Sequence, residues 1–360
     1  MGKRLRFHWS LSSAGAQLKG ATARAAQSGV PDIDAHLRFC RAAEECEIES
    51  LLTAVGFHRP DPIALASALG MLTSKIKFMV ACRSGLVSPT AFVQQVNTVS
   101  ALTGGRICVN MVGGHTPEEQ RRYGDFLAHD GRFERTDEFL TICRGFWGGL
   151  PEVSFHGKYF QVEKGKLQIP FVFGKGPEIF VSGSSPRAAD LAIKHASCLW
   201  TLPDGPEELW PRIRPVLESG VEVGLLVSLI TRPTRREALA AAQSTLEVLG
   251  SSPRVVHAEF AKRSDSVAFG STLALAERNQ ERNQEWLTRC LWTGAVPFLG
   301  APAIALVGSF EEIAQTLLDY GQTGITQFLF MGWPDTEEMK LFRQGVLPLV
   351  RAGESRQGAT

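Results

Sequence analysis

The chain has 360 residues, of which 38 are Lys or Arg and 37 are Asp or Glu, and 44% of its residues are hydrophobic. This balance is ordinary for a globular protein with a large core, and it gives no basic face for nucleic acid or a membrane surface. We therefore expect small-molecule chemistry, with neither nucleic acid nor membrane as a partner.

The seven cysteines are scattered, odd in number and without CxxC spacing. Such a pattern indicates reduced thiols rather than disulfides or zinc ligands, so no metal site is expected. The N-terminus lacks the apolar segment of a signal peptide, and no run approaches the roughly 18 apolar residues of a membrane span. We therefore expect a cytoplasmic protein.

Short apolar runs alternate with amphipathic helical segments along the whole chain. The first four runs are LRFHWSL, SLLTAV, IKFMVAC and RICVNMV, followed by helical segments at 32–46, 62–72, 89–102 and about 132–147. The alternation continues through EIFVSG, ASCLWTL, VGLLVSLI and TQFLFMG. Eight such units predict an α/β fold, a closed (β/α)8 TIM barrel in one domain over 1–360, rather than an open sheet.

Two segments interrupt this alternation. Residues 149–177, after the fourth unit, contain VSFHGKYFQVEKGKLQIP and predict a β-rich excursion. Residues 251–302, between the seventh and eighth units, are long and polar and include the tandem ERNQERNQEW. Because long loops in compact domains are usually functional or mobile, we expect this second insertion to form a lid over the mouth of the barrel.

The segment SGSSPRAADLA follows a predicted strand and opens a helix. The backbone N–H groups of Gly183, Ser184 and Ser185, with the two serine hydroxyls, would meet at the positive end of the helix dipole. This arrangement predicts an anion site that suits a phosphate late in a barrel. A plain N-cap, the commonest role of a serine before a helix, is the alternative.

Polar residues and glycines also follow other predicted strands, at the rim where barrel chemistry gathers. After the fourth strand, Gly113 and Gly114 would let a flat ligand approach the chain closely, beside Asn110 and Val112. The remaining candidates at strand ends are His115 beyond the fourth strand, His58 and Arg59 after the second, and Arg83 after the third. Each of these side chains could instead be a solvated loop residue.

Several familiar signatures are absent from the sequence, including GxGxxG after a first strand, Walker A, HExxH and GxSxG. An organic cofactor held by its phosphate then explains the remaining features. Taken together, TSKIKFMVACRSGLVSPTAFVQQVNTVSALTGGRICVNMVGG, HDGRFERTDEFL, FHGKYF, PEIFVSGSSPRAADLA and GITQFLFMGWPDTEEM resemble the bacterial luciferase-like flavin monooxygenases. The resemblance spans nearly the whole chain and is greatest to the alkanesulfonate and dialkylsulfone monooxygenase branch.

The resemblance implies an enzyme that binds reduced FMN supplied by a separate NAD(P)H-dependent flavin reductase. In such enzymes FMNH2 reacts with O2 to give a C4a-(hydro)peroxyflavin, which oxygenates a substrate under a closed lid. It also implies a homodimer or homotetramer. An F420-dependent oxidoreductase on the same barrel and a non-catalytic flavin-binding protein are the alternatives.

The resemblance also assigns cofactor contacts. It places the FMN phosphate at Gly183, Ser184 and Ser185, and the isoalloxazine edge along Asn110, Val112, Gly113 and Gly114, with Arg83 beside them. Arg132 keeps its motif position, but Phe133 stands where a phosphate-binding tyrosine is common, and Gly113 where threonine is common. His58, Arg59 and His115 are the implied catalytic candidates.

On the substrate side the sequence departs from the sulfonate enzymes. Their two arginines and one histidine correspond here to Leu226, Ser228 and Leu299, which argues against an alkanesulfonate because a buried anion needs charged partners. Trp333 corresponds to the tyrosine of the last strand. The predicted substrate pocket, for a small and largely uncharged compound such as a sulfone or a secondary-metabolite intermediate, contains Trp9, Trp200, Leu226, Ser228, Leu299 and Trp333. Core packing is the alternative for its aromatic residues.

Overall fold

A computed structural model describes residues 3–11, 31–57, 59–249, 264–266, 270, 272, 279, 285–331 and 336–357. Eight parallel strands form a closed barrel, in which β8 pairs with β9 to close the ring. In order around the barrel they are β1 (Arg6–Ser10), β2 (Ser50–Thr53), β3 (Lys77–Cys82), β4 (Ile107–Val112), β7 (Ile179–Ser182), β8 (Cys198–Thr201), β9 (Glu222–Arg232) and β12 (Ile325–Phe330). The predicted TIM barrel is confirmed.

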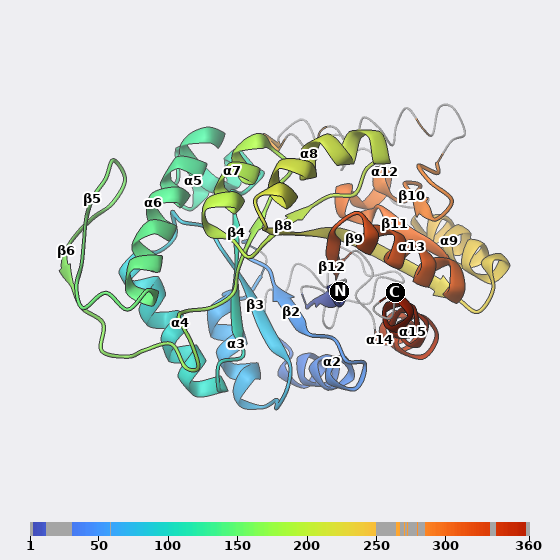
Figure 1. Cartoon of the computed structure of the whole chain (residues 1–360), viewed down its shortest axis with the longest axis horizontal. Coiled ribbons are helices and arrows are strands. Elements are labelled where there is room, and N and C mark those ends of the chain that lie inside the picture. Colours follow the sequence, from blue (N-terminus) through green and yellow to red (C-terminus); the bar gives the residue numbers. More distant parts are fainter. Residues whose placement is uncertain are drawn as a thin grey trace.

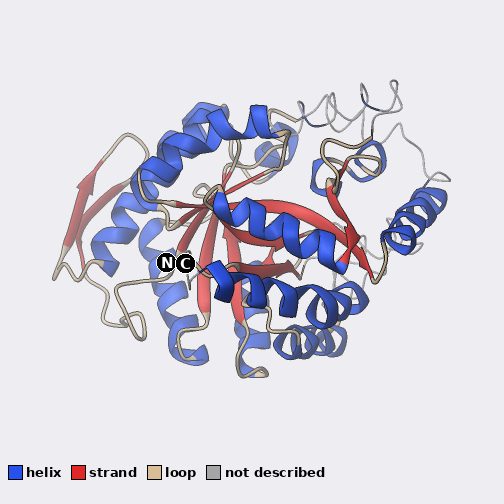
Figure 2. Ribbon diagram, turned by 45° about the vertical axis from the view of Figure 1, so that its right-hand side comes forward, coloured by secondary structure: helices blue, strands red, loops and turns tan. Residues whose placement is uncertain are grey.

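Helices cover the outside of the barrel (Figures 1 and 2). Those between or after the barrel strands are α2 (Ile33–Glu45), α3 (Pro62–Met71), α4 (Pro89–Thr103), α5 (Pro117–Arg122), α6 (His129–Trp147), α7 (Pro186–His195), α8 (Pro206–Glu218), α9 (Arg235–Leu249), α13 (Phe310–Gln322), α14 (Thr336–Leu341), the π-helix η2 (Phe342–Val346) and α15 (Leu347–Gln357). Capping residues in the sequence mark the N-termini of some of these helices. Asp61 caps α3 by accepting from the N–H groups of Ile63 and Ala64, and Ser309 forms a capping box with Glu312 at α13.

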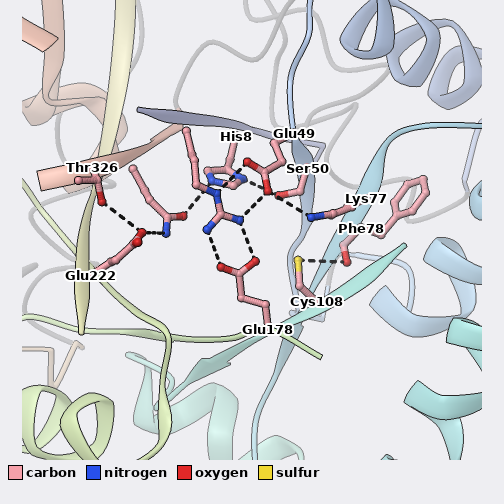
Figure 3. A network of polar contacts seen from close by, with 11 residues as sticks. His8, Glu49, Ser50, Lys77, Phe78, Cys108, Glu178, Glu222 and Thr326 are labelled. Carbon is pink, nitrogen blue, oxygen red and sulfur yellow. Dashed lines mark hydrogen bonds and ion pairs between the residues drawn. The ribbon is translucent and has the colours of Figure 1, made fainter. Parts of the chain in front are cut away.

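The lower end of the barrel interior, where the strands begin, is filled by polar side chains (Figure 3). Arg6 donates to both carboxylate oxygens of Glu49 and of Glu178, at 2.5–2.8 Å. Above this ion pair network, the two ring nitrogens of His8 contact Ser50 Oγ at 2.7 Å and Gln327 Oε1 at 3.0 Å. Burial lowers the pKa of His8 to about 4, so the ring is neutral at pH 7.

The upper half of the interior is apolar. Leu52, Met79, Phe180 and Leu329 pack there with Trp200, whose ring stacks on Phe180 at a centroid distance of 5.5 Å. A Cβ on Gly224 would lie 2.2 Å from the Trp200 ring, so the glycine makes room for the indole inside the barrel. All seven cysteines are free and buried, as their spacing predicted.

Two additions decorate the barrel. The first is the antiparallel pair β5 (Val153–His156) and β6 (Gln161–Gly165), at the left of Figure 1, which lies within 149–177. Its turn is held to α6, because Glu138 accepts from the backbone N–H groups of Lys158, Tyr159 and Phe160.

Among the described residues, no helix is long and apolar enough to cross a membrane, and no cluster of side chains could hold a metal.

The second addition extends β9 beyond the barrel. The second half of β9 pairs in parallel with β11 (Ala305–Ser309), which also pairs with β10 (Leu291–Trp292). The short helices α12 (Val296–Leu299) and η1 (Ala301–Ala303) lie between those two strands in the chain. Neither β11 nor α5 was predicted from the sequence. Most of the predicted lid, 251–302, lies outside the described residues, although 264–266 and 285–302 are inside them.

Candidate active site

A cavity of about 800 Å³ opens at the end of the barrel where the strands finish. Its lining comes from the last residues of six barrel strands and the loops that follow them, together with part of the second insertion. The lining residues include Arg59, Arg83, Asn110, Val112, Gly113, Gly114, His115, Glu118, His129, Phe133, Ser182, Gly183, Ser184, Ser185, Trp200, Thr201, Leu202, Leu226, Ser266, Leu299, Gly300, Pro302 and Met331. This position is where TIM-barrel enzymes carry their chemistry.

One side of the cavity is the start of α7. The Ser185 hydroxyl caps this helix by accepting from the Ala188 N–H at 3.3 Å. The hydroxyls of Ser184 and Thr201 form a hydrogen bond at 2.8 Å. One of them donates in this bond, so the proton of the other can be donated to a ligand. The predicted contribution of the Gly183 N–H is wrong, because that group donates to the Trp200 carbonyl at 2.9 Å and continues the strand ladder.

Gly183 matters for a different reason. A Cβ on Gly183 would lie 2.6 Å from the Ala188 Cβ, closer than real Cβ atoms approach. Glycine therefore lets the end of β7 lie directly against the first turn of α7, which brings both serines to the helix N-terminus. The positive end of the helix dipole then faces the cavity and favours an anion there.

The loop after β4 forms the adjacent side. Gly114 has a φ of +73°, and a Cβ there would lie 1.6 Å from Gln120 Nε2, so this position requires glycine twice over. A Cβ on Gly113 would lie 3.1 Å from the Phe133 ring. The Phe133 ring also packs against His129, with centroids 4.9 Å apart. Both glycines line the cavity, and the space that a side chain at each would occupy is filled by Phe133 and Gln120.

The floor carries one oriented amide. Asn110 Oδ1 accepts from the Ser182 hydroxyl at 2.8 Å, which fixes the amide and leaves Nδ2 as a donor toward a ligand. Trp200 lies beside this floor and is fully buried. The floor therefore combines one hydrogen-bond donor with an aromatic surface.

The wall from β8, β9 and β12 is almost entirely apolar. Its lining residues are Trp200, Thr201, Leu202, Leu226, Leu299, Gly300, Pro302 and Met331, and none of them is charged. Leu226 and Leu299 thus lie at the cavity, as predicted for a substrate pocket. This wall offers a ligand dispersion contacts and the exclusion of water rather than charge.

The opposite wall carries ionisable side chains. Arg83, whose side chain is only 5% exposed, donates from Nη2 to Glu119 at 3.3 Å and lies over the Tyr123 ring at 5.7 Å. Arg59 lies at the exposed edge of the same wall. Burial lowers the pKa of His115, and the nearby charge of Arg83 lowers it further, so His115 is neutral at pH 7 and can accept a proton.

Residues 5–327 match the luciferase-like monooxygenase family. The chain belongs to this family. The match covers most of the chain and includes every barrel strand except the last three residues of β12. Family membership makes the protein a flavin-dependent monooxygenase, in agreement with the prediction from the sequence motifs.

Solved structures share the fold at low sequence identity. A riboflavin lyase, RcaE, solved with modified FMN and riboflavin, has a TM-score of 0.77 and 20% identity, covering 98% of this chain and 92% of its own. EDTA monooxygenase (EmoA) from Chelativorans sp. BNC1 has a TM-score of 0.75 and 19% identity, covering 98% and 95%. An F420-dependent secondary alcohol dehydrogenase has a TM-score of 0.66 and 18% identity, covering 97% and 100%.

Some predicted site residues lie elsewhere in this luciferase-like barrel. Trp9 does not line the cavity: its ring packs on Phe330 at 5.0 Å and near Phe342, in the core outside the barrel. Ser228 is fully buried, and its hydroxyl shares its one proton between the carbonyl oxygens of Pro302 and Met331, at 2.7 and 3.0 Å. Neither side chain is placed to contact a substrate, which corrects both predictions. His58 and Trp333 lie outside the described residues.

Arg132 lies behind the cavity rather than on it. Its guanidinium donates to the Gly113 carbonyl at 2.7 Å, to the Leu127 carbonyl at 2.9 Å and to Asp265 Oδ2 at 2.6 Å. The Asp265 N–H in turn donates to the His115 carbonyl at 3.1 Å. Arg132 therefore positions the β4 loop and ties residues 264–266 of the second insertion to it, rather than binding the cofactor as predicted.

The sequence reasoning missed several cavity residues. Ser182, Thr201 and Ser266 line the cavity but were not among the predicted site residues. His129 also lines the cavity and contacts Asp130 Oδ1 at 2.8 Å. Ser182 and Thr201 are the last residues of β7 and β8, so their position at the ends of barrel strands could have identified them.

The cavity fits a flavin mononucleotide on features of its own. The start of α7 with Ser184, Ser185 and Thr201 suits a phosphate, and the glycine backbone after β4 suits the face or edge of a planar ring. The free Nδ2 of Asn110 is a donor that a ring carbonyl could accept from.

Proposed function

We propose that this protein is a two-component monooxygenase that uses FMNH2 and O2 to oxygenate a small, largely uncharged organic compound, not an alkanesulfonate. The observation that carries the proposal is the cavity itself. It joins a helix N-terminus with two serines, a glycine loop and a fixed amide donor to an uncharged apolar wall. Bound reduced FMN would supply the reaction with O2.

The chain's own residues have separate roles in this proposal. Ser184 and Ser185 hold the phosphate, while Gly113 and Gly114 let the ring lie against the loop after β4. Neutral His115 accepts a proton at the cavity wall. The apolar wall around Leu226 and Leu299 would keep water away from a bound flavin.

The uncharged wall also supports the proposed substrate class. An organosulfur compound such as a sulfone, or a secondary-metabolite intermediate, could bury its apolar body against Leu226 and Leu299. A sulfonate would meet no cation on that wall among the described residues and would lose its hydration there. We expect no turnover of octanesulfonate under conditions in which an uncharged sulfone is consumed.

Further parts of the proposal concern partners and location. Reduced FMN would come from a separate NAD(P)H-dependent reductase, the enzyme would assemble as a homodimer or homotetramer, and it would act in the cytoplasm. Helix α3 supports assembly, because the sequence PIALASALGM is apolar on all sides and Met71 is 58% exposed. Apolar side chains around a whole helix are typical of one that is covered on every side.

The phosphate site gives the proposal a sharp test. Anaerobic titrations would compare reduced FMN with reduced riboflavin, which lacks the phosphate. Ser184→Ala should weaken FMN binding about tenfold, the effect of one lost charge-assisted hydrogen bond, and should leave riboflavin binding unchanged. Ser88→Ala, at the N-cap of α4 and away from this cavity, is the matched control. Equal effects on both flavins would contradict the proposed phosphate site.

An F420-dependent oxidoreductase is the rival function, favoured by the shared fold of the F420-dependent secondary alcohol dehydrogenase. It would transfer hydride without consuming O2. Tighter binding of reduced F420 than of reduced FMN, with substrate reduction under anaerobic conditions, would support the rival. Loss of turnover for every substrate, with release of peroxide alone, would instead indicate a non-catalytic flavin-binding protein.

A further inference from the structure

Arg83 has hydrogen-bonding capacity that the protein does not use. Its Nη2 donates to Glu119 at 3.3 Å, a long distance for a charge-assisted bond. Within the described residues, its Nε and Nη1 atoms are buried and have no hydrogen-bond partner. A buried donor without a partner costs free energy, so a native structure that retains one calls for an explanation.

The surroundings of Arg83 restrict what could satisfy these donors. One face of the guanidinium lies over Tyr123, and Tyr123 stacks on Phe57 with ring centroids 4.3 Å apart. Glu119 is fixed on the other side, because its Oε1 accepts from the Phe57 N–H at 3.2 Å. Arg83 also lines the cavity, so a ligand bound there can contact its side chain.

The Glu119 carboxylate offsets the charge of Arg83, and the same carboxylate also lies near Arg59. The Glu119 carboxylate lies 3.3 Å from its guanidinium, in a setting where the two side chains are 20% and 5% exposed. A second anion at Arg83 would gain attraction to the guanidinium but would face repulsion from Glu119 in surroundings that screen it poorly. An uncharged oxygen acceptor gains the hydrogen bonds without that repulsion.

We propose that Arg83 and Glu119 form a neutral receptor that binds an uncharged oxygen acceptor, such as a carbonyl, amide or sulfonyl oxygen, and discriminates against anions. This inference rests on the proposed function, because it requires that an organic ligand enters this cavity. The oxygen can belong to the substrate or to a carbonyl of the flavin ring, and both offer the same acceptor chemistry.

A pair of nearly isosteric probes separates the two charge states. Methyl phenyl sulfone and benzenesulfonate differ by a methyl group in place of an anionic oxygen. Binding of each would be measured by calorimetry on the full chain. The receptor predicts that the wild-type protein binds methyl phenyl sulfone at least about tenfold more tightly than benzenesulfonate. Tighter binding of benzenesulfonate, equal binding of both, or binding of neither would overturn it.

Two variants test the pair itself. Glu119→Gln removes the balancing charge and keeps the side-chain size, so benzenesulfonate affinity should rise at least about tenfold, as relief of about 1.4 kcal/mol of repulsion gives. Glu118→Gln is the matched control, because Glu118 also lines the cavity but pairs with Arg122. An equal rise in both variants would show that only the total charge of the cavity matters, and would refute the receptor.

Arg83→Met should weaken methyl phenyl sulfone binding about tenfold. If this variant does not fold, the comparison of Glu119→Gln with Glu118→Gln decides alone. Repeating the titrations with saturating FMN identifies the source of the oxygen. A sulfone that still binds, with FMN affinity unchanged in Arg83→Met, assigns the receptor to the substrate. Competition between sulfone and FMN, with FMN weakened in Arg83→Met, assigns it to the flavin.

These measurements need no turnover. A protein that binds the sulfone as described but does not consume O2 with reduced FMN would retain the receptor and lose the proposed function. A protein that oxygenates substrates but shows no charge discrimination at Glu119 would keep the proposed function and lose the receptor. The two failures are therefore distinguishable.

Discussion

Replacing Arg132 with methionine tests whether this residue holds the β4 loop in place. The guanidinium is 2% exposed and donates to the carbonyl oxygens of Gly113 and Leu127 and to the Asp265 carboxylate. Methionine fills most of the volume but leaves all three acceptors without their donor. Each buried acceptor left unpaired costs about 1–3 kcal/mol.

Partial exposure reduces the expected loss. Asp265 is 26% exposed, so water can replace part of its interaction with Arg132. We therefore expect Arg132→Met to lower the free energy of unfolding by about 3–5 kcal/mol, the range for breaking a buried ion pair from one side. Arg132→Lys keeps the charge but loses the planar guanidinium that reaches three acceptors. Its free energy of unfolding should therefore lie between those of the wild type and of Arg132→Met.

Urea unfolding, followed by fluorescence and circular dichroism, measures these differences. The control is Arg187→Met, which removes an ion pair to Asp130 at 3.7 Å between side chains that are 53% and 60% exposed. Such an exposed pair contributes at most about 1 kcal/mol. If Arg132→Met costs no more than Arg187→Met, Arg132 does not organise the loop, and the reasoning from its three contacts is refuted.

Three further predictions follow from other contacts. Gly183→Ala should weaken reduced-FMN binding about tenfold, because its Cβ would push the start of α7 away from β7, and an unchanged dissociation constant would contradict this. Phe133→Tyr should tighten reduced-FMN binding but not riboflavin binding, because the ring edge lies near Gly113 and Gly183 and a hydroxyl there adds a donor. The free energy of unfolding falls when the pH is lowered from 7 to 4, and this fall should be up to about 3 kcal/mol smaller in His8→Gln than in the wild type, as measured by urea unfolding. The pKa of His8 is about 4 when folded and 6.5 when unfolded, so the wild type loses stability as pH falls below 6.5 and the variant should lose less.

The barrel was predictable because each unit is local in sequence. A short apolar run followed by an amphipathic helix identifies one βα unit wherever it occurs, and eight of them define the closed sheet. β11 was missed because it pairs with the second half of β9, more than 70 residues away in the chain. That pairing depends on the unusual length of β9, which local patterns do not reveal.

Individual side-chain directions limited the prediction of the site. On β1, His8 points into the barrel, so its neighbour Trp9 necessarily points outward into the core between sheet and helices. Applying the period of two to β1 would have excluded Trp9 from the pocket. The pairing of Arg83 with Glu119 was beyond local patterns, because Glu119 lies on a helix that the sequence did not reveal.

The motif around Ser184 and Ser185 indicates the correct position of these residues at the cavity, but it does not show which of their groups are free to donate a hydrogen bond to a ligand. The hydroxyls and the helix start face the cavity, whereas the Gly183 N–H is used by the sheet. Sequence shows which residues follow a strand, but the last hydrogen bond of the ladder depends on the length of the neighbouring strand. Here β8 continues far enough for Trp200 to accept from Gly183.

Anaerobic titration with reduced FMN, oxidised FMN and reduced F420, followed by mixing of the tightest complex with O2, tests the central claim most directly. We expect reduced FMN to bind most tightly. We also expect the bound flavin to reoxidise in two separated phases when O2 is added, because the apolar wall of the cavity keeps water away from it. Tighter binding of F420, or reoxidation in a single phase as fast as that of free flavin, would contradict this claim.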